Sequence, residues 1–172
     1  MKRKGSKTAL CGLTAALSLM FLLFACLVPS GKMGLCALAG VFPACAVLTG
    51  GVSYGFFSWA ASGLLGLLLL PDKFTALLYL VALGVYPVLK SVLERLPNRG
   101  AEWLLKFLYF NAVLTLFWLF ARTALLGALP AMLSHTGLLY AAGNIVFLIY
   151  DLALSQLLTQ IGKRLKKGLH KS

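Results

Sequence analysis

Residues 8–28 read TALCGLTAALSLMFLLFACLV, an apolar run of 21 residues that contains no charge. About 20 such residues, each rising about 1.5 Å in a helix, cross the hydrocarbon core of a bilayer. The run therefore predicts a membrane-spanning helix. Basic residues accumulate on the cytoplasmic side of membrane helices, so its N-terminal flank is expected in the cytoplasm. The flanking basic residues are Lys2, Arg3, Lys4 and Lys7.

Five further apolar segments follow, separated by short polar or glycine-containing connections. Hydrophobic residues make up 60% of the chain and charged residues 12%, which is far from the composition of a soluble domain. The apolar runs are continuous rather than alternating, so helices are favoured over a β-barrel. We predict an all-α, polytopic integral membrane bundle of about six helices that forms a single membrane domain over residues 1–172. The further spans are predicted at residues 33–49, 52–70, 74–93, 103–126 and 137–161.

The basic residues also predict the topology. They cluster at the N-terminus, around Pro97 and at the C-terminus, whereas the turns at Lys32 and Lys73 hold one each. Alternate connections are therefore inside and outside, with both termini cytoplasmic in a multi-pass protein of the cell membrane. The joint at residues 50–51 is the open point, because a re-entrant element there would reduce the count to five or four spans.

Two pairs of oppositely charged residues and one proline predict further details of these helices. The pairs Lys90/Glu94 and Glu102/Lys106 have the i,i+4 spacing of a helix surface, so the fourth and fifth helices are expected to project slightly past the membrane. Pro43 in the middle of the second span predicts a kink.

Charge and cysteine spacing exclude several functions. The formal net charge is +12, and its position at the membrane edges indicates contact with lipid headgroups rather than nucleic acid. The cysteines show no CxxC spacing and no nearby histidine, so we expect no metal and no cofactor. No nucleophile with a base, HExxH or phosphate-binding glycine loop is present, so an enzyme is not expected.

Ionisable residues inside apolar spans are costly and often functional, and Arg122 and Asp151 are the two that stand out. With about 1.5 Å of rise per residue, they lie roughly 8 Å and roughly 20 Å from the outer ends of their helices. Depth thus matches Arg122 with Asn144, and Asp151 with Asn111. We expect two polar clusters between the fifth and sixth helices.

Each cluster has a structural and a functional interpretation. Arg122 either extends to the outer headgroups or binds an anionic or carbonyl-bearing ligand. In the second case stacking and hydrogen bonds would come from Trp118, Tyr140 and Asn144, and His135 in the outer connection 128–136 could close over the ligand. Asp151 is either a hydrogen-bonded buried acid beside Asn111 or part of a proton or cation relay.

Small residues follow one another at helical spacing along the first span. Thr8, Gly12 and Ala16 lie four positions apart, and such stripes let membrane helices approach closely. They serve either packing within the bundle or docking of another membrane protein.

Six spans, the stripe Thr8, Gly12 and Ala16, and basic termini together resemble the S components of energy-coupling factor (ECF) transporters, at the level of architecture over the whole chain. In that family the S protein captures a vitamin or similar solute, and helix one meets a T-type membrane subunit driven by two cytoplasmic ATPases. The resemblance implies that Gly12 and Ala16 lie on the docking face and that Arg122, Asn144 and Tyr140 line a pocket. The short connection 29–33 departs from the longer lid that the family often has there.

Two other functions stay open. The chain is also similar in size and helicity to the rod-shape-determining membrane protein D family, which would make it a scaffold of cell-envelope machinery that transports nothing. A small secondary transporter would need coupling-ion groups at the midplane and an internal repeat, and the sequence shows neither.

Overall fold

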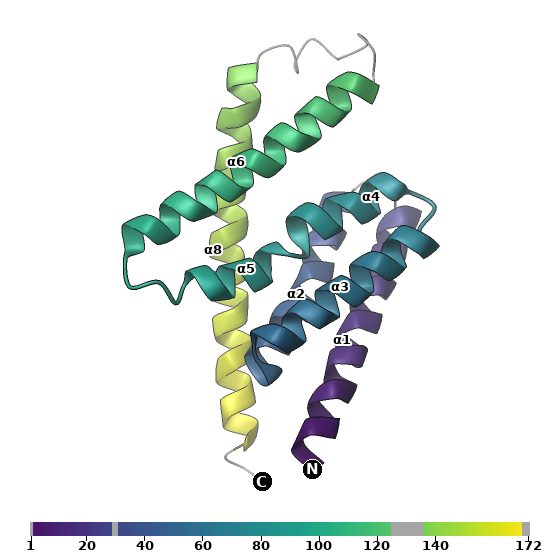
Figure 1. Ribbon diagram of the computed structural model, residues 1–172, viewed down its shortest axis with the longest axis vertical. Coiled ribbons are helices and arrows are strands. Elements are labelled where there is room, and N and C mark those ends of the chain that lie inside the picture. The colour runs from purple at the N-terminus through teal and green to yellow at the C-terminus, as the bar shows by residue number, and fades with distance from the viewer. Residues whose placement is uncertain (1, 29–30, 125–135, 170–172) are drawn as a thin grey trace. The chain divides into compact units, whose positions relative to one another are not determined.

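The computed structural model describes residues 2–28, 31–124 and 136–169, and the side chains of 5–28, 31–120 and 137–164. In these ranges the chain is helical and has no strand (Figure 1). The elements are α1 (Lys2–Leu27), α2 (Lys32–Gly50), α3 (Val52–Leu69), α4 (Lys73–Leu78), the π-helical turn η1 (Tyr79–Leu83), α5 (Tyr86–Leu93), α6 (Arg99–Ala124) and α8 (Thr136–Leu169).

Six helices in the described part of the chain are long and apolar enough to span a membrane. Five of them are α1, α2, α3, α6 and α8. The sixth is the composite of α4, η1 and α5, which together cover Lys73–Leu93. The prediction of an all-helical chain with six such helices is confirmed in the described residues, although α1 begins six residues before its predicted span and α8 ends eight residues after its own.

The chain contains two compact units, and the single membrane domain stays a prediction. One unit contains Met1–Arg95 and Leu157–Ser172, and the other contains Leu96–Gln156. The first therefore holds α1 to α5, and the second holds α6 with most of α8. Each unit has its own polar contacts, described separately below.

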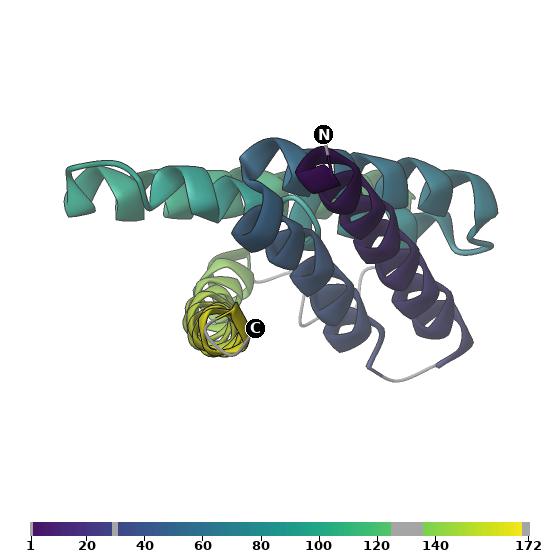
Figure 2. The same ribbon diagram turned by 90° about the horizontal axis from the view of Figure 1, so that it is seen from below.

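In the first unit, α1, α2 and α3 pack against one another (Figure 2). Their shared core is rich in small residues, which let membrane helices approach closely. Hydroxyl groups add bonds between helices: Thr14 Oγ1 lies 2.8 Å from Ser58 Oγ, and Ser18 Oγ donates to the Ala39 carbonyl at 2.9 Å. The buried core cluster is Leu22, Ala25, Cys36, Ala39, Leu70, Ala76 and Tyr79.

Gly51 separates α2 from α3 as two distinct helices. Its φ of 105° lies in the region that favours glycine, and its N–H donates to the Val47 carbonyl at 2.9 Å. Beyond the turn, Gly55 packs on the Val47 side chain, and a Cβ there would lie 3.0 Å from the Pro43 carbonyl oxygen. The two helices therefore fold back on each other as a close hairpin, and α2 continues through Pro43.

Asp72 joins two connections of the first unit. Its carboxylate caps α4 by accepting from the N–H groups of Phe74 and Thr75, and it also accepts from the Thr75 hydroxyl at 2.7 Å and the Lys32 ammonium at 3.1 Å. The Thr75 hydroxyl, followed by Lys32, lowers the pKa of the Asp72 carboxyl below its usual value. The ionised form therefore stabilises the fold.

We expect Asp72→Ala to lower the free energy of unfolding by about 1–2 kcal/mol at pH 7, because a helix cap and its ion pair are lost. A carboxyl whose pKa is lowered by folding stabilises the protein above its unfolded pKa, and this contribution is lost as pH falls through the folded pKa. The difference between variant and parent should therefore shrink below about pH 4. Unfolding in detergent micelles from pH 7 to 3 measures it, and a difference that is independent of pH would contradict this role.

Candidate functional site

The polar side chains of α6 and α8 meet in the second unit. The amides of Asn111 and Asn144 bond each other reciprocally, with N–O distances of 3.1 and 3.2 Å. Each amide nitrogen also donates to the preceding turn of its own helix, Asn111 to the Phe107 carbonyl and Asn144 to the Tyr140 carbonyl, both at 2.8 Å. The two asparagines therefore form a closed, self-complementary pair.

A second pair lies one turn away. The hydroxyl oxygens of Thr115 and Tyr140 are 2.6 Å apart, and the Thr115 hydroxyl also donates to the Asn111 carbonyl at 2.7 Å. As residue numbers rise on α6, those of the partners on α8 fall, so the two helices run in opposite directions along this contact. We call the paired residues Asn111, Asn144, Thr115 and Tyr140 the polar seam.

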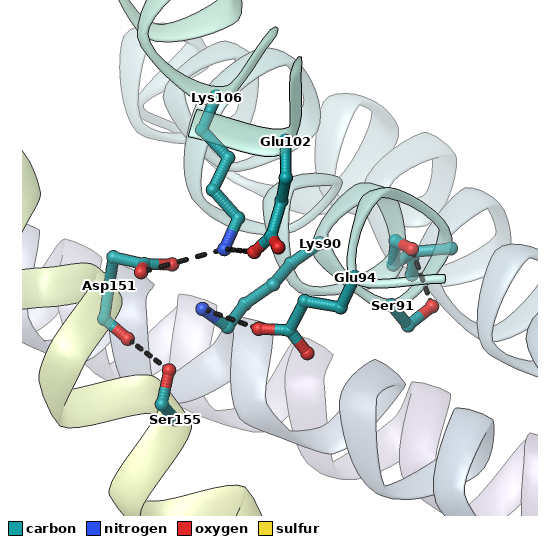
Figure 3. Close-up of polar contacts among 8 residues, drawn as sticks. Lys90, Ser91, Glu94, Glu102, Lys106, Asp151 and Ser155 are labelled. Carbon is teal, nitrogen blue, oxygen red and sulfur yellow. Dashed lines mark hydrogen bonds and ion pairs between the residues drawn. The ribbon is translucent and has the colours of Figure 1, made fainter. Parts of the chain in front are cut away.

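A buried charge cluster continues the seam toward the start of α6. The Lys106 ammonium lies 2.6 Å from Glu102 Oε1 and 3.7 Å from Asp151 Oδ2 (Figure 3). The exposed fractions of the Lys106 and Asp151 side chains are 2% and 3%, and that of Glu102 is 16%. The ammonium also lies 5.3 Å from the centre of the Trp103 ring, within the range of a cation–π contact.

Aromatic rings surround the contact between the seam and the charge cluster. The rings of Phe110 and Phe147 are stacked with their centres 4.5 Å apart, and Phe107 meets Phe147 edge-on at 5.9 Å. Lys106 and Asp151 of the charge cluster are buried, whereas the four residues of the polar seam are half-buried. Burial strengthens the electrostatic interactions of the charge cluster.

The structure changes the expected pairing of these residues. The sequence matches Asn111 with Asp151, whereas Asn111 bonds Asn144 and Asp151 faces Lys106. The prediction matched residues by their depth along each helix, counted from the assumed helix ends. Which side chains meet depends instead on how α6 and α8 are aligned where they cross. Thr115 and Lys106 were both missed, although Lys106 falls three positions inside the predicted span 103–126. Its i,i+4 spacing to Glu102 suggested a surface pair.

The other predicted ligand residues are placed as follows. Asn144 and Tyr140 belong to the polar seam, and Trp118 is partly buried on α6. The backbone of Arg122 belongs to α6, but its side chain lies outside the described residues, as does all of His135. Of the predicted ligand residues, Asn144 and Tyr140 therefore have side-chain hydrogen bonds to Asn111 and Thr115 of α6.

The predicted docking residues lie in the first unit on an exposed part of α1. Thr8, Gly12 and Ala16 are all exposed, and a Cβ added to Gly12 would meet no atom within 4 Å. By contrast, Thr14, Ala15 and Ser18 of the same helix are buried. The stripe is therefore not used for packing inside the first unit.

Within the described ranges, no three His, Cys, Asp or Glu side chains come together as a metal site would require. Comparison of the chain with protein-family models, with curated proteins and with solved structures gives no match.

Proposed function

We propose that this chain is the membrane-embedded substrate-binding subunit of an ECF-type transporter that takes up a vitamin or similar small solute. In this proposal it lies in the cell membrane with both termini in the cytoplasm, and it works with a T-type membrane subunit and two cytoplasmic ATPases. The six apolar helices and the basic residues at alternate connections support this arrangement.

The observation that carries the proposal is the exposed stripe of Thr8, Gly12 and Ala16 on α1. Small residues in membrane helices gain most when another helix lies against them, because backbones can then approach closely. The first unit leaves this position of α1 uncovered, although it buries the adjacent face. A T-type membrane subunit is the partner proposed to cover it.

The polar seam is the proposed solute site, with Trp118, Arg122 and His135 as further candidates on the outer side. A solute entering there has to replace the bonds of the Asn111–Asn144 pair, so it should present a donor and an acceptor to each amide. Tyr140 and Thr115 would add hydroxyl contacts. Solute binding then exchanges bonds instead of leaving buried polar groups unsatisfied.

The test is affinity purification of the tagged full chain from native membranes in mild detergent, with mass spectrometry of retained proteins and small molecules. We expect a T-type membrane subunit, two ATPases and a bound solute. Gly12→Leu should reduce recovery of the T-type subunit at least about tenfold, since a bulky side chain prevents close helix approach, and should leave solute retention unchanged.

Gly34→Leu is the matched control, because Gly34 is also exposed and a Cβ there meets no atom within 4 Å, but it lies on α2. It should leave recovery of the partner unchanged. Equal recovery with Gly12→Leu and the parent would contradict docking at α1.

A scaffold of cell-envelope machinery, similar to the rod-shape-determining membrane protein D family, is the second candidate. The bonding of Asn144 and Tyr140 to Asn111 and Thr115 favours it, because these side chains then serve helix association. Recovery of envelope-synthesis proteins with no retained small molecule would support this function over transport.

A further inference from the structure

The helix that covers Lys73–Leu93 is interrupted by a π-helical turn. In η1 (Tyr79–Leu83) the hydrogen bond at the C-terminal end runs from the Gly84 N–H to the Tyr79 carbonyl, five residues back, at 2.7 Å. The turn closed by this hydrogen bond therefore contains one residue more than an α-helical turn. Such turns are rare, occur singly within α-helices and are frequent at functional positions.

The π-turn changes the partner of the Leu80 carbonyl. In an α-helix this oxygen would accept from the Gly84 N–H, four residues later. Here the indole N–H of Trp59, on α3, donates to it at 3.1 Å. In the π register the Gly84 N–H bonds the Tyr79 carbonyl and the Trp59 indole bonds the Leu80 carbonyl, whereas an α-helical register would bring the Gly84 N–H to the Leu80 carbonyl.

Neighbouring helices hold η1 by close backbone approach and a hydroxyl pair. A Cβ on Gly40 would collide with the Leu83 carbonyl oxygen, and a Cβ on Gly63 would collide with the Leu80 side chain. The Tyr79 hydroxyl, fully buried, lies 2.7 Å from Ser62 Oγ. Close contacts at Gly40 and Gly63 and the hydrogen bonds of Trp59 and Tyr79 therefore hold the turn together.

The segment that follows can take up a change of register. Gly84 and Val85 form a turn between η1 and α5, and Pro87 has no N–H to donate back toward Leu83. The regular hydrogen-bond ladder is therefore interrupted at this point, although Gly84 and Val85 keep helical backbone dihedrals. α5 beyond it carries Lys90, whose ammonium is buried and lies 3.0 Å from Glu94.

We propose that η1 is a two-register switch whose π form is held by the indole of Trp59. When the indole withdraws, the Gly84 N–H bonds the Leu80 carbonyl, and the extra residue passes into the Gly84–Val85 turn. One residue of shift corresponds to a rotation of about 100°, so α5 turns relative to α4 and moves Lys90. Trp59 is a positioning residue in this device, which stands independently of the proposed transport function.

The first test measures the distance between α3 and α5. Spin labels at Leu68→Cys and Val92→Cys occupy exposed positions of these helices, in a full-length chain whose four native cysteines are replaced by alanine. With Trp59 present we expect one distance population. Trp59→Phe keeps a ring but removes the donor, and should place at least a third of the molecules in a second population. An unchanged distribution in the Trp59→Phe variant would overturn the switch.

The second test does not depend on how well the Trp59→Phe variant folds. Deletion of Val81 removes the extra residue, so that the Gly84 to Tyr79 bond becomes an ordinary α-helical bond and both flanking helices keep their places. This deletion variant should fold, and should show one distance population with or without Trp59→Phe. Deletion of Leu64, in the uninterrupted α3, is the control that should prevent folding. If the Val81 deletion variant fails to fold, as the Leu64 deletion variant should, the proposal is contradicted.

Discussion

Replacement of Lys106 by methionine is expected to lower the free energy of unfolding by about 3–5 kcal/mol, the usual cost of removing one partner from a buried ion pair. The Lys106 ammonium faces two carboxylates, Glu102 at 2.6 Å and Asp151 at 3.7 Å. Asp151 is only 3% exposed, so its charge would lose the ammonium that faces it without gaining water. Denaturant titration of the purified protein in micelles, followed by circular dichroism, measures the change.

The double variant Lys106→Met, Asp151→Leu separates loss of the pair from loss of packing. Removing both charges leaves no buried carboxylate at position 151, so the double variant should be more stable than Lys106→Met alone. A double-mutant cycle then gives the coupling energy between the two side chains. If the two single effects simply add, the contact between Lys106 and Asp151 contributes nothing to stability.

Gly40→Ala is expected to destabilise the first unit by about 3 kcal/mol or more, because overpacking a close helix contact forces backbone to move. A Cβ at this position would collide with the Leu83 carbonyl oxygen and lie 3.2 Å from its carbonyl carbon. These are backbone atoms of η1, which cannot rotate away as a flexible side chain can. The same titration in micelles measures the loss.

Gly34→Ala supplies the control on the same helix. Gly34 is exposed, and a Cβ there would meet no atom within 4 Å. Alanine favours a helix over glycine by up to about 1 kcal/mol, so this substitution should be neutral or stabilising. Equal effects at positions 34 and 40 would show that helix propensity, and not contact with η1, controls the response.

Each predicted span overlaps one long apolar helix because length and apolar composition alone define a helix that can cross a bilayer. The joint at residues 50–51 was open in the sequence, since two glycines permit several conformations. The structure gives Gly51 a φ of 105° and two separate helices. The π-turn was not predictable, because the residues that contact it, Trp59 and Gly40, lie on other helices.

The candidate site was predictable by residue type but not by pairing. Asn111, Asn144, Tyr140 and Asp151 stood out as polar groups in apolar spans, and each has a polar contact across the α6–α8 interface. Lys106 was misread because i,i+4 spacing to Glu102 occurs equally on exposed helix surfaces. The exposed fraction of a side chain depends on how α6 and α8 cross, and their contacts join residues 25 or more positions apart, which sequence periodicity does not encode.

The length of α8 has a consequence for the proposed membrane arrangement. Its 34 residues, at about 1.5 Å each, exceed the thickness of a hydrocarbon core of about 30 Å. A tilt of about 20°, common for membrane helices, shortens its vertical extent only slightly. One continuous helix therefore carries both Asp151 in the interior and the exposed Lys163 and Arg164 near its C-terminal end. In the proposed membrane arrangement, this single helix links the buried Asp151 to the charges of Lys163 and Arg164 beyond the hydrocarbon core.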